Sequence, residues 1–230
     1  MALAFALNEL SNGGGDPVAV AHQGHLDFQG GRGSGIDVAN AVAGGVVEYR
    51  MEQRSTSPRA LPAGLVYRLI WSGWPASTGK KLERLSSHGR QPSADALVAS
   101  AERMANTWRN GSVDELLDGY LEYIPVLQQF SADHGLSVFG AGHAELTQLA
   151  AGARLVYKPC GAGDGDIGIL LADDAGHADD FIAESLPEDA GVGLTVRCSN
   201  RPERTVRFGA ESAIPRCREH AVRRSGTQWV

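Results

Sequence analysis

The chain has 230 residues, 43% of them hydrophobic, which is enough apolar sequence to bury a sizeable core and excludes wholesale disorder. A formal net charge of −6 argues against nucleic acid as the main partner, and no apolar run reaches the length of a membrane-spanning helix. Cys160, Cys198 and Cys217 are odd in number and widely spaced, which indicates reduced thiols in the cytoplasm and no C-x-x-C metal or redox site.

The first sixty residues carry the signals of short helices and one strand. Residues 1–10 are rich in Ala and Leu, which predicts the end of a helix, and nothing caps its beginning. Asp16 followed by Pro17 is a strong helix start, with a carboxylate at the N-cap and proline at the first helical position. The predicted elements are a helix from Asp16 to about Phe28, a short helix at 38–43 and a strand at 46–50. The polar segment 52–62 is the best candidate for a domain boundary.

From Leu65 onward the predicted order is strand, helices, strand, strand, helix, strand. These elements lie at about 65–71, 94–108, 112–130, 143–151, 154–157, 167–172, 177–185 and 193–198. The second long helix opens with a capping box from Ser112 to Glu115, and Pro125 predicts a kink within it. The first has an apolar face at helical spacing, made of Ala94, Leu97, Val98, Ala101, Met104, Ala105 and Trp108. This order predicts an α+β sandwich with a ferredoxin-like antiparallel sheet.

A glycine-rich loop from Lys158 to Gly168 separates two of these strands. Its glycines can adopt positive φ, and consecutive N–H groups in such a turn form a concave nest that suits phosphate. Gly163, Gly165 and Gly168 match G-x-G-x-x-G, but a strand follows where a dinucleotide fingerprint needs a helix. No Walker A sequence occurs in the chain. A phosphate site and a tight glycine turn joining two strands are the alternatives that the pattern leaves.

Two further loops carry candidate functional side chains. In the loop from Arg32 to Asp37, the aspartate is either a plain helix N-cap or a carboxylate that orients an acceptor or holds Mg²⁺ near a phosphate. In the loop from Ser72 to Lys80, hydroxyls and a lysine suit substrate contacts. Ser77 and Thr78 equally suit the start of the next helix, so both interpretations stay open.

Three other candidates favour structural roles. His22 and His25 are three residues apart on one predicted helix, but zinc would need a third ligand on that face, so packing or surface histidines are favoured. Cys160 has only Lys158 as a basic neighbour in sequence, which favours a small core residue over a nucleophile. The sequence therefore predicts no metal site of protein ligands alone.

Together the three loops resemble motifs of the GHMP kinase superfamily, which includes galactokinase, homoserine kinase and mevalonate kinase, and most of all those of phosphomevalonate kinases. Residues 158–166 resemble the family's third motif, K-P-S-G-A-G-G-G-D, with Cys160 and Asp164 in place of the usual Ser and Gly. Residues 33–39 resemble the acceptor-side loop, whose aspartate sits by the transferred phosphoryl group. Residues 71–78 resemble the W-T-G…S-T stretch that starts the C-terminal domain.

The resemblance covers about residues 1–208 and implies an architecture. A remnant of a ribosomal-protein-S5-like N-terminal domain takes up 1–60, a GHMP kinase C-terminal ferredoxin-like sandwich 61–208, and a basic tail at 209–230 is expected to be disordered. The family's loop of type P-x-x-x-G-L-G-S-S-A, which cradles ATP phosphates, lies before the point where this chain begins. Residues 1–10 resemble the rest of the helix behind that loop, so we expect this chain to bind ATP weakly or not at all.

The resemblance also implies an activity and its residues. The expected reaction is phosphoryl transfer from ATP, with Mg²⁺, to phosphomevalonate in the cytoplasm; a mevalonate or sugar kinase and a non-catalytic fragment or binding protein are the alternatives. The implied partner is a small phosphorylated or hydroxylated acid, with no nucleic acid or membrane. Asp37 is the implied catalytic residue. The implied substrate-binding residues are Ser34, Ser77, Thr78 and Lys158, and the phosphate loop is Gly161, Ala162, Gly163 and Asp164. Asp164 beside a phosphate would need Mg²⁺ or a lysine to offset its charge.

Overall fold

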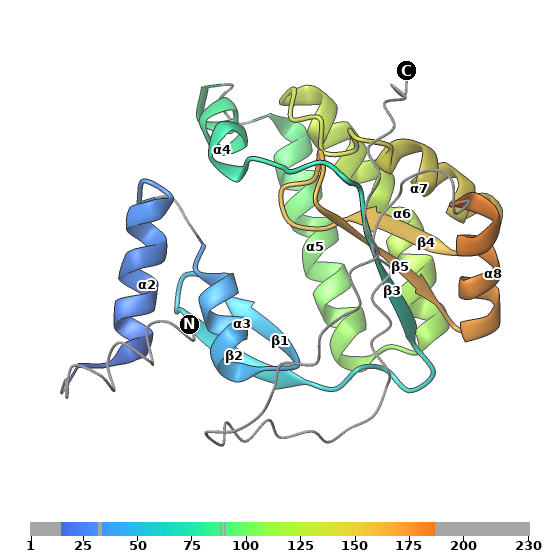
Figure 1. The fold of residues 1–230 in the computed structure, drawn as a ribbon, viewed down its shortest axis with the longest axis horizontal. Coiled ribbons are helices and arrows are strands. Elements are labelled where there is room, and N and C mark those ends of the chain that lie inside the picture. Colours follow the sequence, from blue (N-terminus) through green and yellow to red (C-terminus); the bar gives the residue numbers. More distant parts are fainter. Residues whose placement is uncertain (1–14, 32–33, 88, 90, 187–230) are drawn as a thin grey trace, which may run out of the picture.

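The structure is a computed structural model that describes residues 15–31, 34–87, 89 and 91–186. Figure 1 shows two parts, a small one of short helices and a hairpin and a larger one of helices around a sheet. The helix predicted at 1–10, the strand predicted at 193–198 and the basic tail lie outside the described residues.

The smaller part contains two helices and a β-hairpin. Its elements are α2 (Pro17–Phe28), α3 (Ile36–Ala43), β1 (Val46–Arg50) and β2 (Ser55–Arg59). The Asp16 carboxylate accepts a hydrogen bond from the Val18 N–H at 2.9 Å, which confirms the predicted helix start. The hairpin pairs β1 with β2 antiparallel, so the polar segment 52–62 contains a strand that the sequence did not predict. All five residues of β2 are exposed, which is why no alternation of burial marked it.

The larger part is built on a three-stranded antiparallel sheet. Its strands are β3 (Val66–Trp71), β4 (Val156–Pro159) and β5 (Ile167–Ala172), in the order β3-β5-β4. β3 pairs with β5 although β4 comes between them in the chain, and this order, with β5 in the middle, is the one expected for the first three strands of a ferredoxin-like sheet. The α+β class predicted from the element order is therefore confirmed.

Helices cover both faces of this sheet. The long helices α5 (Pro92–Asn110) and α6 (Val113–Asp133) share one buried cluster with Val156 and Leu171. The helices α7 (His143–Gly152) and α8 (Ala175–Ser185) share the other with Tyr157 and Leu170. Neighbouring residues of one strand thus enter opposite cores, as the pleat of a strand requires. Figure 1 shows the resulting layers.

Two details of the helices differ from the sequence predictions. A ten-residue helix, α4 (Thr78–Ser87), occupies a stretch where no helix had been predicted beyond a possible start at Ser77 and Thr78. The predicted apolar face of α5 is confirmed at Met104, which is buried, and at Trp108, which packs against the same cluster; Val98 is instead 57% exposed, and Ser93 and Ser100 are buried as well. Met104 packs closely on α6, where a Cβ on Gly119 would lie 2.9 Å from its sulfur. The capping box of α6 is confirmed, with Glu115 accepting from the Ser112 N–H at 2.8 Å.

Glu48 of β1 connects the two parts. Its carboxylate accepts hydrogen bonds from Arg109 of α5 at 2.8 and 2.9 Å and from Arg59 of β2 at 2.6 and 3.1 Å. These bonds, first that of Arg109, lower the pKa of Glu48 to about 2. The hairpin is thereby held to the C-terminal end of α5.

Candidate functional site

The glycine loop connects β4 to β5 as a turn between antiparallel strands. The Cys160 N–H donates to the Ile167 carbonyl at 2.8 Å, and the Gly163 N–H donates to the Cys160 carbonyl at 3.1 Å. Positive φ angles follow one another at Gly161, Gly163, Asp164, Gly165 and Asp166. The loop is therefore a strand connection, as one of the two interpretations predicted, and it has the left-handed backbone on which a phosphate nest depends.

Residues from two other segments of the chain form hydrogen bonds with the second half of this loop, at Asp164 and Asp166. The Asp164 N–H donates to the Val138 carbonyl at 2.9 Å, and a Cβ on Gly163 would collide with that same carbonyl oxygen. The Asp166 N–H donates to the Trp74 carbonyl at 2.6 Å, and the Ser72 N–H donates to the Asp166 carbonyl at 2.7 Å. Two of the three loops singled out in the sequence, 158–168 and 72–80, therefore lie side by side.

His143, the first residue of α7, is buried beneath the loop and contacts its backbone, a role that the sequence did not reveal. Its Nε2 lies 3.0 Å from the Gly165 carbonyl oxygen and its Nδ1 lies 2.7 Å from the Tyr157 hydroxyl. A carbonyl can only accept, so Nε2 carries the proton and the neutral ring accepts from Tyr157 at Nδ1. Burial lowers the pKa of this histidine, which favours the neutral ring. The hydroxyl of Tyr157 in turn fills the space that a side chain at Gly168 would need.

The part of the loop at Gly161 and Ala162 is open. Among the residues that the structure describes, the N–H groups of Gly161, Ala162 and Gly165 have no protein acceptor. A Cβ on Gly161 would meet no atom within 4 Å, so the backbone there borders free space. Two adjacent N–H groups without an acceptor, next to a left-handed glycine, form an anion-binding nest. The N–H groups of Gly163 and Asp164 are engaged inside the protein, so the nest is narrower than the sequence implied.

A lysine from α4 lies against this loop. The Lys81 ammonium donates to the Ala162 carbonyl at 3.0 Å and lies 3.6 Å from the Asp164 carboxylate. A hollow of about 220 Å³ is lined here by Ser77, Lys80, Lys81, Arg84, Leu136, Ser137 and Asp164. Lys81 thus forms an ion pair with Asp164, and the sequence did not single it out.

The other predicted substrate-binding residues occupy different positions. Ser77 lines this hollow and Thr78 is the first residue of α4. Lys158 is largely buried on β4, where its ammonium donates to the Pro159 carbonyl at 2.9 Å. Burial lowers the pKa of Lys158 and raises that of the neighbouring Cys160 thiol, which fits a core thiol better than a nucleophile.

The Asp37 loop lies in the smaller part, at the start of α3. Asp37 is exposed in the first turn of that helix, and the N-cap is Gly35, so the plain N-cap interpretation of Asp37 is wrong. The Ser34 hydroxyl accepts from the Ile36 N–H at 3.3 Å, and its carbonyl accepts from the Tyr49 hydroxyl at 2.9 Å. The structure does not bring Asp37 into the hollow beside the glycine loop; Figure 1 shows α3 across from that loop.

The predicted histidine pair makes no metal site in the part of the chain that is described. No group of three or more His, Cys, Asp or Glu side chains suited to a metal ion occurs there. His22 packs its ring close to Gly35, as expected of a packing histidine. None of the described helices is both long and apolar enough to cross a membrane.

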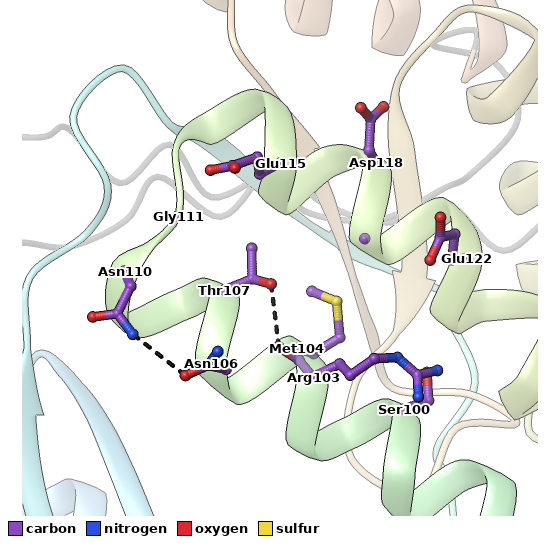
Figure 2. Close-up of a pocket in the computed structure, with 11 residues that line it drawn as sticks. Ser100, Arg103, Met104, Asn106, Thr107, Asn110, Gly111, Glu115, Asp118 and Glu122 are labelled. Atoms are coloured by element: carbon purple, nitrogen blue, oxygen red, sulfur yellow. Dashed lines mark hydrogen bonds between the residues drawn. The ribbon is translucent and has the colours of Figure 1, made fainter.

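A larger hollow of about 450 Å³ lies between α5 and α6, away from these loops (Figure 2). In Figure 2, Arg103, Asn106 and Thr107 lie on one of these helices and Glu115, Asp118 and Glu122 on the other. Its acidic rim repels anions, and Glu115 already serves the capping box of α6. The smaller hollow, with its lysines, is the better candidate for a site that binds phosphate.

Comparisons with known proteins bear on the family. No protein-family model matches this chain. A phosphomevalonate kinase from Streptomyces sp. (strain CL190) is 27% identical over 190 residues, covering 70% of this chain and 51% of the relative. The chain therefore spans about half the length of the curated relative that it matches.

Solved kinases share its fold. Streptococcus pneumoniae phosphomevalonate kinase, in complex with phosphomevalonate and AMPPNP, matches with a TM-score of 0.62 and 18% identity, over 84% of this chain and 65% of that chain. L. major mevalonate kinase, in complex with R-mevalonate, matches with a TM-score of 0.57 and 18% identity, over 74% and 54%. At 18% identity these similarities show a shared fold, which is the fold that the motif resemblance implies.

Proposed function

We propose that this chain acts in ATP-dependent phosphoryl transfer of the GHMP type, with phosphomevalonate as the acceptor, in the cytoplasmic synthesis of isoprenoid precursors. The observation that carries the proposal is the nest at Gly161 and Ala162. Its open N–H groups lie beside the Lys81 ammonium, in a fold shared with a phosphomevalonate kinase. Such a loop suits a phosphate group of the substrate or of the nucleotide.

The acceptor decides what the protein must supply. A phosphate monoester has its second pKa near 6, so it is largely dianionic at neutral pH and already a nucleophile. It needs positioning and charge neutralisation more than deprotonation. We assign Asp37 to orienting the acceptor or a Mg²⁺ ion, and Ser34, Ser77, Thr78 and Lys158 to the anionic groups of the substrate. With a hydroxyl acceptor such as mevalonate, Asp37 would instead have to act as general base.

The nest formed by Gly161 and Ala162 is the place where the residues present fit a phosphate of ATP. The backbone of Gly161 and Ala162 would hold a phosphate, with Lys81 close by. Mg²⁺ is usually held by one or two carboxylates together with phosphates, so Asp37 and Asp164 are the two predicted residues that could serve it. When bound, MgATP supplies the phosphoryl group that is transferred. The AMPPNP in the related structure supports the choice of nucleotide.

A second candidate function is binding without catalysis on the same fold. It is favoured because Asp37, the implied catalytic residue, does not line the hollow beside the glycine loop. A fragment or binding protein of this kind would keep the acceptor nest and lack turnover. A mevalonate or sugar kinase is the remaining alternative, and the shared fold with mevalonate kinase supports keeping it.

The test separates acceptor binding from turnover. Calorimetry with phosphomevalonate, mevalonate and galactose measures binding to the 230-residue chain, and a coupled assay at high MgATP measures ADP release. We expect phosphomevalonate to bind most tightly and Asp37→Asn to lower ADP release on the order of a hundredfold. Asp27→Asn, an exposed aspartate of α2, is the matched control and should leave the rate unchanged.

Each outcome decides between the candidates. Equal rates in the wild-type chain and Asp37→Asn would exclude the role of Asp37. Phosphomevalonate binding with no ADP release would favour the binding protein. Tighter binding of mevalonate or galactose would move the assignment to another GHMP kinase, and binding of none of them would refute the proposal.

A further inference from the structure

Asp164 places a negative charge next to any anion that binds to the loop. It stands where the resembling motif has glycine, and its backbone keeps the left-handed conformation, with φ of 64°. Its carboxylate is 44% exposed and follows the nest formed by Gly161 and Ala162. A carboxylate this near an anion site repels the ligand unless a cation compensates it.

Lys81 is placed to provide that compensation. Its side chain is only 13% exposed, and its ammonium reaches both the Ala162 carbonyl, at 3.0 Å, and the Asp164 carboxylate, at 3.6 Å. Burial lowers the pKa of Lys81, while Asp164 acts in the opposite direction and favours the charged ammonium. The Lys81 ammonium thus contacts two residues of the loop: Ala162, whose N–H belongs to the nest, and Asp164, which carries the negative charge.

The other cations near the loop make different contacts or remain at the surface. Lys158 donates to the Pro159 carbonyl, and Arg84 donates to the Gly135 carbonyl at 2.5 Å. Lys80 is exposed at the rim of the hollow. Lys81 is therefore the one described lysine that forms an ion pair with Asp164.

We propose that Lys81 is a positioning residue for the phosphate loop: it ties α4 to the loop and cancels the charge of Asp164, so that the nest can accept a phosphate. The proposal deepens the proposed function, because it takes phosphomevalonate as the source of that phosphate. It assigns Lys81 two separable effects. The contact with Ala162 orders the backbone, and the charge opposite Asp164 removes the repulsion.

The experiment uses the full chain with Lys81→Met, Asp164→Asn and the double variant. Methionine keeps the length of the side chain and removes the charge, and Arg103→Met on α5 removes one positive charge far from the loop. Hydrogen exchange of the peptide containing residues 160–166 reports loop order with no ligand present. Calorimetry with phosphomevalonate reports the electrostatic effect, and thermal unfolding shows whether each variant folds.

We expect Lys81→Met to speed exchange in the loop severalfold and to weaken phosphomevalonate binding roughly tenfold. Asp164→Asn should bind at least as tightly as the wild-type chain. The double variant should keep the faster exchange and recover binding to within about threefold of the wild-type chain, because no uncompensated carboxylate is left. Arg103→Met should change neither quantity, which a purely global effect of charge would not predict.

Other results overturn the proposal. Unchanged loop exchange in Lys81→Met would exclude the positioning role. A double variant that binds as weakly as Lys81→Met would exclude the cancellation of charge. If the wild-type chain binds no phosphomevalonate, the proposed acceptor is wrong, and the exchange measurement still decides the positioning role. The two failures are therefore distinguishable.

Discussion

The glycine loop and the Asp37 loop look alike in sequence, yet the structure builds them in different ways. The glycine loop rests on the buried His143 and Tyr157, and on the Val138 carbonyl. The Asp37 loop is held by the half-buried Tyr49 and by a hydroxyl turn at Ser34. In the first loop the geometry is set by the interior, whereas in the second it depends on contacts at the surface.

This difference fits the roles proposed for the two loops. A nest must present its N–H groups in a fixed direction before the anion arrives, so support from a buried network is an advantage. An acceptor-side carboxylate can adjust its position, since surface loops have lower local stability. The comparison predicts that equal chemical changes lower the free energy of unfolding more in the glycine loop than in the Asp37 loop.

The largest effect is expected at Gly163. Alanine there would collide with the Val138 carbonyl at a φ of 67°, so we expect a loss of about 3 kcal/mol or more in the free energy of unfolding. Gly161→Ala is the matched control: its φ is 56°, and its side chain would enter open space. It should cost about 1 kcal/mol. Urea unfolding of both variants measures the difference, and equal losses would contradict the described packing.

A smaller contrast comes from removing one hydroxyl in each region. Tyr157→Phe leaves the buried Nδ1 of His143 without its donor, and we expect a loss of about 2 kcal/mol. Tyr49→Phe removes the bond to the Ser34 carbonyl near the surface, where water can replace it, so the loss should be about 0.5 kcal/mol. Denaturant unfolding compares them, and a larger loss at Tyr49 would reverse the comparison.

The sequence predicted most elements whose signals are local. Asp16 with Pro17 marked the start of α2, and Ser112 with Glu115 marked α6, because a cap acts within one turn of its helix. The strand β2 was missed because its exposed polar residues form a strand only by pairing with β1. The burial of Ser93 and Ser100 on α5 was missed because a serine gives no apolar signal in the sequence.

The backbone conformation of the candidate site could be predicted from the sequence, but the side chains that hold it in place could not. The glycines of residues 158–168 announced a turn with positive φ, and the structure confirms that conformation. His143 gave no local signal, since its partners Gly165 and Tyr157 come later in the chain. Lys81 had one: Asp164 required a cation, and the chain holds only three lysines, Lys80, Lys81 and Lys158. Choosing among them required the fold.

The smallest effect concerns pH and the ring of His143. Burial places the pKa of His143 below its ordinary value of 6.5, so below that pH the unfolded chain binds a proton more readily than the folded one. Stability from this group is therefore complete above pH 6.5 and falls with further acidification. His143→Gln should show a smaller loss of stability from pH 7 to about pH 5 than the wild-type chain. His177→Gln, an exposed histidine of α8, is the control, and identical pH profiles for His143→Gln and the wild-type chain would exclude the buried neutral ring.

The central claim is that the open N–H groups of Gly161 and Ala162 bind a phosphate of the substrate. Titration of the ¹⁵N-labelled chain with phosphomevalonate, followed by amide NMR, tests it most directly. We predict that the largest shifts occur at Gly161 and Ala162, with small ones at Gly163 and Asp164, whose N–H groups are already bound within the protein. Shifts confined to the hollow between α5 and α6, or none in residues 160–166 at saturation, would contradict the claim.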